Sequence, residues 1–262
     1  MRGVDYTCYR TDRPLTIDGR LDKAAWANAP RSPRFADIVT GAPAWFDTHV
    51  RLLWDDDCLY FGFEAQETDV WGTLTDRDSK IYEENDVELF IAGENAYYEF
   101  EISANNVIYE VFWIWKDVHH PGGPYWRAPE FDPARQRTLV LDGVGGHVHE
   151  RGERWGFLDW DMPGLRHAVY VDGTLNKRDD IDRGWSAEIA IPWRSLAPLA
   201  DGRSLPPRDG DVWRIDCSRF QKIGPNGEVL DPCAGWTWTR HGHYDSHIPE
   251  VFPRITFSTR TI

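Results

Sequence analysis

The sequence has few basic residues, few methionines and no long apolar run. It contains 29 Lys and Arg against 43 Asp and Glu, which gives a net charge of -14. This balance argues against nucleic acids and anionic membrane surfaces as partners, because both are bound through basic patches. No stretch approaches 18 uninterrupted apolar residues, so we expect no membrane-spanning segment. With 2 methionines the chain can hardly supply a Met/His axial pair, and we expect no haem.

Familiar catalytic and targeting motifs are also missing. There is no G-x-S-x-G, Walker loop or G-x-G-x-x-G, so we expect no nucleotide. The opening "MRGVDYTCYRTDRP" lacks the apolar core of a signal peptide. We therefore expect a cytoplasmic protein, or a secreted or periplasmic one if a leader was removed. The four cysteines have no metal-type spacing, and although their even number allows disulfides, we favour reduced, mostly buried thiols: Cys8, Cys58, Cys217 and Cys233.

Alternation of apolar and polar residues dominates the rest of the chain. It predicts about nine strands, at 49–54, 58–65, 86–92, 97–103, 106–113, 167–173, 185–191, 212–220 and 253–258. Helical signals are confined to 21–29 and one turn at 192–196. We therefore expect an all-β fold, a single antiparallel β-sandwich of jelly-roll type over residues 1–262, with a short N-terminal helix and long rim loops. The residues predicted to face the core between the two sheets are Val87, Leu89, Phe100, Ile102, Ile189 and Ile191.

One long irregular segment interrupts this pattern at 116–137, where Pro, Gly, His and aromatic residues gather. Loops of this length inside a compact domain are usually functional or mobile. No linker, repeat or low-complexity tract divides the chain, so one domain is the better interpretation.

Several phrases taken together resemble the family 9 carbohydrate-binding modules and their stand-alone relatives. They are "LTIDGRLDKAAWANAP", "VRLLWDDDCLYFGFEAQETDV", "NDVELFIAGENAYYEFEISANNVIYEVF", "VDGTLNKRDDIDRGWSAEIAIPWRSL", "GDVWRIDCSRFQ" and "WTWTRHGHYDSHIPEVFPRITF". The resemblance covers almost the whole chain in order. It implies a jelly-roll β-sandwich, in agreement with the strand pattern, and a glucose-like ring clamped between two aromatic side chains.

The resemblance also suggests where that clamp lies. One wall precedes the "VELF" strand and carries Tyr82; the other lies in the loop before the final strand, where His243, Tyr244 and His247 are the flat side chains. Aromatic faces suit the axial C–H bonds of a pyranose, while polar groups read its hydroxyls. The best-described sugar binders of the family carry Trp at both positions, and Glu101 stands where some of them have a basic residue. Further candidate ligand-binding residues are Glu83, Glu84, Asn85, Asn106, Trp113, Trp115, Trp126, Trp236 and Trp238.

Three histidines within seven residues, His241, His243 and His247, leave three hypotheses open. His241 and His243 would face one side of a strand, and with His247, and with His119 or His120, they could hold a transition metal. Alternatively the segment faces a ligand without metal, or it is a solvated polar loop. Structural calcium is a separate expectation: the family resemblance implies it, and the Asp-rich turns at 55–57 and 178–182 would supply hard oxygen ligands.

Two functions follow from these observations. The leading one is a carbohydrate-binding protein that recognises a sugar or glycan end through an aromatic-lined rim. The alternative is a glycan-active enzyme, a hydrolase or lyase, which would use rim carboxylates and the 241–247 histidine loop, with or without a metal. Its candidate carboxylates are Glu83, Glu84, Asp86 and Glu110. The sugar, its linkage and the oligomeric state stay open.

Overall fold

The computed structural model describes residues 5–262 and is built almost entirely of β-strands. The fourteen strands of this part of the chain are β1 (Asp5–Arg10), β2 (Ala36–Asp37), β3 (Thr48–Trp54), β4 (Cys58–Gln66), β5 (Asp86–Ala92), β6 (Ala96–Ser103), β7 (Ile108–Trp115), β8 (Thr138–Leu141), β9 (Arg154–Phe157), β10 (Arg166–Asp172), β11 (Gly184–Pro192), β12 (Val212–Ile223), β13 (Val229–Thr237) and β14 (Arg254–Thr261). The helical elements are α1 (Ala24–Asn28) and the 3-10 helices η1 (Ile81–Glu83), η2 (Lys116–Val118), η3 (Pro129–Phe131), η4 (Trp193–Leu199) and η5 (Pro249–Val251).

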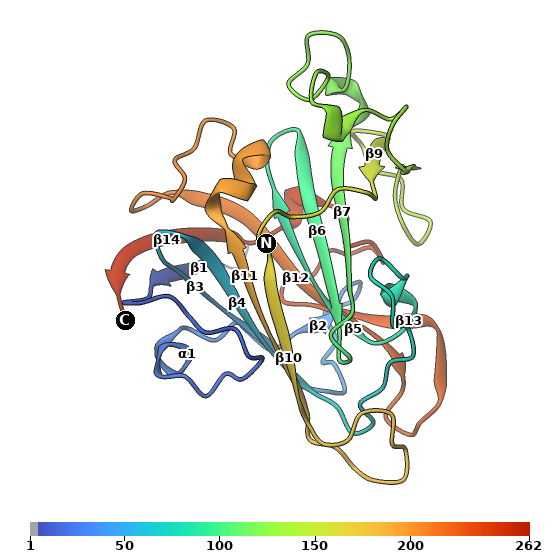
Figure 1. The fold of residues 1–262 in the computed structure, drawn as a ribbon. Helices are drawn as coiled ribbons and strands as arrows, with labels where there is room; N and C mark the ends of the chain where they lie inside the picture. Colours follow the sequence, from blue (N-terminus) through green and yellow to red (C-terminus); the bar gives the residue numbers. More distant parts are fainter. Residues whose placement is uncertain (1–4) are drawn as a thin grey trace.

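Hydrogen bonds join the strands into one continuous sheet, which we call the ladder and which does not close into a barrel. Its order is β10-β11-β4-β3-β1-β14-β12-β5-β6-β7-β9-β8, and β13 adds to β12 and β2. The helix α1 and the β9 end of the ladder lie on opposite sides of the molecule (Figure 1). β1 pairs in parallel with both β14 and β3. The other pairs of named strands are antiparallel, as predicted, and β1 is a parallel strand that joins the two halves of the ladder.

The two halves of the ladder share one main core. Phe61 and Ile189 come from the β10–β3 half, whereas Leu89 and Phe112 come from the half that contains β5–β7, and all four are fully buried in one cluster. The residues predicted to face the core are buried there without exception: Val87, Leu89, Phe100, Ile102, Ile189 and Ile191. The all-β sandwich is confirmed.

The same alternation sends every second residue of β5, β6 and β7 to the other side of the sheet. We call this side the outer face. Phe90, Tyr97, Val111 and Trp113 pack there in a second buried cluster. Loops cover the outer face, which is why its side chains are buried although they point away from the main core.

The irregular segment 116–137 contains only the short helices η2 and η3. Tyr125 and Phe131 from it are buried in the main core. The four cysteines are free and buried, as expected for reduced thiols. Between residues 5 and 262 no helix has the length and apolar character needed to cross a membrane.

Candidate functional site

A cavity of about 260 Å³ opens on the outer face over β5, β6 and β7. Three parts of the chain form its sides: η1, strand β8 with Val144 just after it, and the segment between β13 and η5. Its lining combines aromatic rings with carboxylates, and consists of Tyr82, Glu88, Glu99, Glu101, Tyr109, Trp113, Leu139, Leu141, Val144, Phe220, Tyr244, Asp245, Ser246 and His247. We call this cavity the outer-face pocket.

Tyr82 and Tyr244 reach the outer-face pocket from separate loops. Tyr82 lies in η1, is half-buried, and meets the ring of Tyr109 edge-on at 5.5 Å between centroids. Burial raises the pKa of Tyr82 to about 12, so its hydroxyl stays neutral and can donate a hydrogen bond. The Tyr244 hydroxyl donates to the Cys233 carbonyl oxygen at 2.7 Å, and its ring meets Phe220 edge-on at 5.6 Å. Both rings are therefore held in place before any ligand arrives.

Three glutamates reach the pocket from β5 and β6. Glu88 is paired across the two strands with Glu101, and Phe90 with Glu99, so these side chains share the outer face. The Ser218 hydroxyl donates to Glu88 at 2.6 Å, and the Trp113 indole N–H donates to Glu99 at 2.7 Å. Burial raises the pKa of Glu88 to about 7; burial and the nearby Glu88 raise that of Glu99 to about 8. Near neutral pH this floor can both donate and accept hydrogen bonds.

Trp113 depends on a glycine in the neighbouring strand. Gly156 of β9 pairs directly with Trp113, and a Cβ atom at Gly156 would lie only 2.7 Å from the indole ring. The absence of a side chain there leaves room for the indole. Trp113 is 2% exposed and stacks on Tyr97, so it acts as a rigid wall of the pocket.

Asp86, Glu88 and Glu101 form what we call the carboxylate cluster. One oxygen from each lies within 4.8 Å of the others. Asp86 Oδ2 and Glu101 Oε2 are buried and have no hydrogen-bond partner. Burial, with the charges of Glu88 and Asp86 respectively, raises the pKa of Asp86 and of Glu101. Among residues 5–262 this is the single group of three or more His, Cys, Asp or Glu ligand atoms that could hold a metal ion.

The three histidines of the 241–247 segment do not converge on one point. Both ring nitrogens of His241 are engaged, one with Asp216 Oδ2 at 2.9 Å and the other with the Asp245 carbonyl oxygen at 2.7 Å. His243 is exposed and stacks on His147 with ring centroids 4.2 Å apart. The hypothesis of a metal held by His241, His243 and His247 is therefore not supported, because each imidazole has its own separate surroundings.

His247 is the one histidine of this segment that lines the pocket. Its Nδ1 lies 3.0 Å from the Tyr97 hydroxyl, and its ring meets Phe90 and Trp113 edge-on at 5.3 and 5.1 Å. Burial and the positive charge of Arg154 lower the pKa of His247 to about 3. It is therefore a neutral, tightly packed ring rather than a cation.

Most of the other polar residues predicted to bind ligand lie elsewhere. Glu83 is exposed beside Lys80. Glu84 accepts hydrogen bonds from the Thr73 backbone N–H at 2.8 Å and from the Thr73 hydroxyl, which fixes its own loop. Asn106 is exposed at the β6–β7 turn, where its side-chain Oδ1 lies 2.9 Å from His167 Nδ1.

The remaining tryptophans predicted at the rim do not line the pocket. Trp115 is buried against His149, with ring centroids 4.5 Å apart. Trp126 is 46% exposed on the 116–137 segment. Trp236 and Trp238 are buried in the main core, and Trp238 packs on Tyr6. Of the predicted ligand-binding set, the structure brings together Tyr82, Trp113, Tyr244 and His247.

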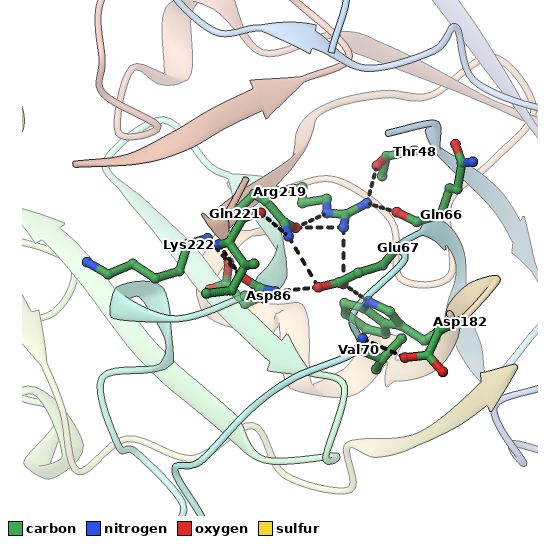
Figure 2. Close-up of polar contacts among 12 residues, drawn as sticks. Thr48, Gln66, Glu67, Val70, Asp86, Asp182, Arg219, Gln221 and Lys222 are labelled. Atoms are coloured by element: carbon green, nitrogen blue, oxygen red, sulfur yellow. Dashed lines mark hydrogen bonds and ion pairs between the residues drawn. The ribbon is translucent and has the colours of Figure 1, made fainter. Parts of the chain in front are cut away.

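The base of the loop that carries Tyr82 is pinned by a buried polar network (Figure 2). The Asn85 side-chain amide donates to Glu67, so the two ends of the 68–84 segment meet. Glu67 also accepts from the Trp185 indole at 2.8 Å and from Arg219 at 3.1 Å. Arg219 in turn donates to the Thr48 hydroxyl and the Gln66 carbonyl, at 2.9 and 2.8 Å. Asn85 is therefore a structural residue, and its network holds the Tyr82 loop against β12.

In the Asp-rich turns expected to hold calcium, the carboxylates of Asp55 and Asp182 accept hydrogen bonds from the protein, whereas Asp180 Oδ1 is buried without a partner. Asp55 accepts hydrogen bonds from the Asp57 and Cys58 backbone N–H groups at 2.8 Å. Asp182 accepts from the Val70 and Thr174 N–H groups at 2.8 and 2.7 Å. The three carboxylates that do converge within the described chain are those of the carboxylate cluster.

Glu110, a candidate catalytic carboxylate, lies on the side of the sheet away from the pocket. It accepts hydrogen bonds from the Tyr98 hydroxyl at 2.6 Å and the Met162 N–H at 3.0 Å, and it pairs with Arg77. Two residues that the sequence analysis did not propose, Glu88 and Glu99, take its place in the pocket. The pattern that could have revealed them is alternation: Glu88 stands between Val87 and Leu89, and Glu99 stands beside Phe100, all three predicted to face the core, so both glutamates must face the other way.

Comparison with known proteins identifies a family that part of the chain resembles. Residues 17–121 match the family described as carbohydrate family 9 binding domain-like. The family resemblance is confirmed for this segment. It includes Tyr82, the three glutamates of the pocket floor and Trp113, whereas the wall formed by Tyr244 and His247 lies beyond it. No curated protein matches the chain.

Two solved structures illustrate the likeness of fold. A protein from Bacteroides uniformis named "putative carbohydrate-binding protein" is 14% identical, with a TM-score of 0.60 over 98% of this chain and 100% of that one. A family 9 carbohydrate-binding module from Caldicellulosiruptor kristjanssonii in complex with glucose is also 14% identical, with a TM-score of 0.49 over 97% of each chain. The likeness to the first of these shows that the two chains share a fold.

Proposed function

We propose that the protein binds carbohydrate, and that the outer-face pocket holds the end of a sugar or glycan. The observation that carries this proposal is the combination in one cavity of aromatic rings from separate loops, Tyr82 and Tyr244, with a floor of hydrogen-bonding carboxyl groups. The match of residues 17–121 to the family 9 carbohydrate-binding domains supports it.

The chemistry of the two kinds of lining residue is complementary for this task. The C–H bonds of a sugar ring pack against aromatic faces, and its hydroxyls need directional polar partners. Glu88, Glu99 and Glu101 supply such partners from a buried floor, where hydrogen bonds are stronger than in water. Trp113 and Ser218 fix two of these carboxyl groups, so little ordering is needed on binding.

The size of the cavity favours a terminal sugar over the middle of a chain. Its volume of about 260 Å³ lies below the ~300–1,000 Å³ typical of pockets for drug-sized ligands. One ring fills such a space, and a long polysaccharide would have to enter by its end.

The direct test is removal of one wall. Tyr82→Ala should weaken binding of the best ligand from a glycan panel by about tenfold or more, because a large side chain packed on a ligand contributes roughly 1–3 kcal/mol. The melting temperature should change little, since Tyr82 is half-buried at the surface. Isothermal titration calorimetry measures the affinity.

Trp45→Ala is the matched control, because Trp45 is an aromatic side chain 48% exposed outside the pocket. Its affinity should equal that of the wild type. Unchanged affinity in Tyr82→Ala, or an equal loss in Trp45→Ala, would contradict the proposed site.

Glycan hydrolysis is a second candidate function, and one observation favours it. Glu88 and Glu99 have pKa values of about 7 and 8, in the range of a general acid near neutral pH. Product analysis after long incubation with the same glycan panel separates the two functions. Binding alone leaves the glycans intact, whereas hydrolysis releases shorter products that disappear in Glu88→Gln or Glu99→Gln.

A further inference from the structure

We propose that the outer-face pocket selects a sugar that carries a protonated amino group, such as the end of an unacetylated hexosamine chain. This inference rests on the proposed carbohydrate binding and specifies its ligand.

The charged lining of the pocket is of one sign. Glu88, Glu99, Glu101 and Asp245 line it, and neither Lys nor Arg does so within the described chain. Asp245 is already occupied, because it accepts hydrogen bonds from His147 Nδ1 at 2.7 Å and from the His247 N–H at 2.8 Å. The glutamates therefore form the part of the pocket that lacks a positive partner.

The nearby cationic groups His241 and Arg154 form no ion pair with these glutamates in the described chain. His241 is hydrogen-bonded to Asp216. Arg154 of β9 is fully buried, and its guanidinium lies over the rings of Trp115 and Tyr97, 4.9 and 5.8 Å from their centroids. Its nitrogens have no hydrogen-bond partner in the described structure, so it makes no ion pair with the glutamates. It acts on Glu99 and His247 only through its field.

Buried oxygens with unused hydrogen-bonding capacity lie at the same place. Glu101 is 1% exposed and lines the pocket, and in the described chain neither its Oε2 nor Asp86 Oδ2 accepts a hydrogen bond from an N–H or O–H group; the two carboxyl groups contact each other. Ser246 is 4% exposed and also lines the pocket, and its hydroxyl lies beside the carboxyl group of Glu88. Buried polar atoms normally have partners, and a ligand that donates hydrogen bonds would supply them.

The spacing of the carboxylate cluster suits an ammonium group. One oxygen from each residue lies within 4.8 Å of the others, so a single ammonium group can donate hydrogen bonds of about 2.8 Å to more than one of these carboxyl groups. A positive charge there would also relieve the mutual repulsion of Asp86, Glu88 and Glu101, which helps to keep their pKa values high.

The rest of the pocket favours an organic cation over a metal ion. Calcium takes 6–8 oxygen ligands, whereas the pocket that contains Glu88 and Glu101 is also lined by the rings of Tyr109, Trp113 and Phe220. Some oxygens of the cluster are also engaged already, since Glu88 accepts from Ser218 and Asp86 from the Phe220 N–H at 3.2 Å. Aromatic rings around a carboxylate floor attract a cation that has an apolar body. A sugar ring with one ammonium substituent has this character.

The test compares sugars that differ at one substituent. Methyl glycosides of glucosamine and galactosamine are titrated at pH 7, each beside its hydroxyl and N-acetylamino counterparts. We expect at least one amino sugar to bind tenfold or more tightly than both of its neutral counterparts. Glu101→Gln keeps the shape of the side chain and removes its capacity to ionise when a cation binds, and should reduce this preference to less than about threefold. Glu130→Gln, an exposed glutamate outside the pocket, should keep the full preference.

Each other outcome overturns the inference in a distinguishable way. Equal or tighter binding of a neutral sugar, weakened by Tyr82→Ala, would leave the proposed function standing and remove the amino selectivity. Binding of none of these sugars, with no ligand in a wider glycan panel, would remove both. Stabilisation by calcium chloride that is lost in Glu101→Gln, without any preference for amino sugars, would assign the cluster to a metal ion.

Discussion

Two buried acidic centres lie close together in this molecule and are built in opposite ways. Glu67 is 1% exposed and has a full set of partners: Arg219, Trp185, Gln221 and Asn85 (Figure 2). The carboxylate cluster of Asp86, Glu88 and Glu101 is equally buried, but two of its oxygens have no partner and no Lys or Arg forms an ion pair with it in the described part of the chain.

This difference distinguishes a buried carboxylate that stabilises the fold from carboxylates that are placed to bind a ligand. A buried carboxylate is tolerated when an opposite charge and hydrogen bonds replace the water that it loses. Glu67 meets this condition within the protein and pins the loop of Tyr82. The carboxylate cluster does not, and it opens onto a pocket where a ligand can meet the condition instead.

The largest expected effect comes from removing the partner of Glu67. Arg219→Ala leaves a buried carboxylate unpaired and should lower the free energy of unfolding by about 3–5 kcal/mol. Urea unfolding followed by fluorescence measures the change. A loss below about 1 kcal/mol would mean that the network contributes little, and the comparison between the two centres would break.

At the carboxylate cluster we expect a substitution to change the free energy of unfolding in the opposite direction. Burial raises the pKa of Glu88 from its ordinary value of 4.5 to about 7, so Glu88 stabilises the fold at low pH and loses that contribution as the pH rises through 7. Glu88→Gln should therefore increase the free energy of unfolding at pH 8 by on the order of 1–3 kcal/mol. Glu67→Gln is the matched control and should destabilise the protein.

The pH dependence of the melting temperature of the unliganded wild type also tests whether the glutamates of the pocket floor destabilise the fold when they ionise. Between pH 6.5 and 8.5 its melting temperature should fall, because Glu88 and Glu99, with pKa values of about 7 and 8, lose protons in the folded state over this range. His247, with a pKa of about 3, is neutral in the folded state throughout; its pKa of 6.5 in the unfolded state makes only a small opposite contribution, at the low end of this range. In Glu88→Gln the slope should be smaller. A melting temperature that rises over this range would contradict the assignment of these pKa values.

The smallest expected effect is that of calcium. The Asp-rich turns at Asp55 and Asp182 already bind the protein's own N–H groups, so chelation should shift the melting temperature by no more than about 2 °C. Differential scanning fluorimetry with calcium and with EDTA makes the measurement. A larger shift would show a bound cation, and Glu101→Gln would then tell whether the carboxylate cluster holds it.

The sequence was a good guide to the strands with strong alternation and a poor one to the rest. All nine predicted segments are strands, and α1 begins within the predicted helical segment. Of the strands that it missed, β2, β8 and β9 are short, β1 is rich in polar residues, and β13 is interrupted by Pro232 and Gly235; they exist because neighbouring strands pair with them. Such pairing joins residues far apart in the chain and leaves little local pattern.

For the candidate site, the sequence predicted the residues that the loops contribute better than those of the pocket floor. The structure brings Tyr82, Trp113, Tyr244 and His247 to one pocket, but Glu84 and Asn85 were misread because carboxylates and amides near a binding loop can equally well hold the loop itself. Glu88 and Glu99 were missed because their strands were read for the main core alone. Whether such a strand has a second buried face depends on loops that cover it, and no local pattern records that.

The central claim is that a sugar ring sits between Tyr82 and Tyr244 on the glutamate floor. A crystal structure of the protein with a saturating monosaccharide glycoside tests it most directly. We expect density for one ring in the outer-face pocket, with hydrogen bonds of about 2.7–3.0 Å to Glu88 or Glu101. Density for the sugar anywhere else, such as the depression lined by Pro14, Ile17 and His167, would contradict the account.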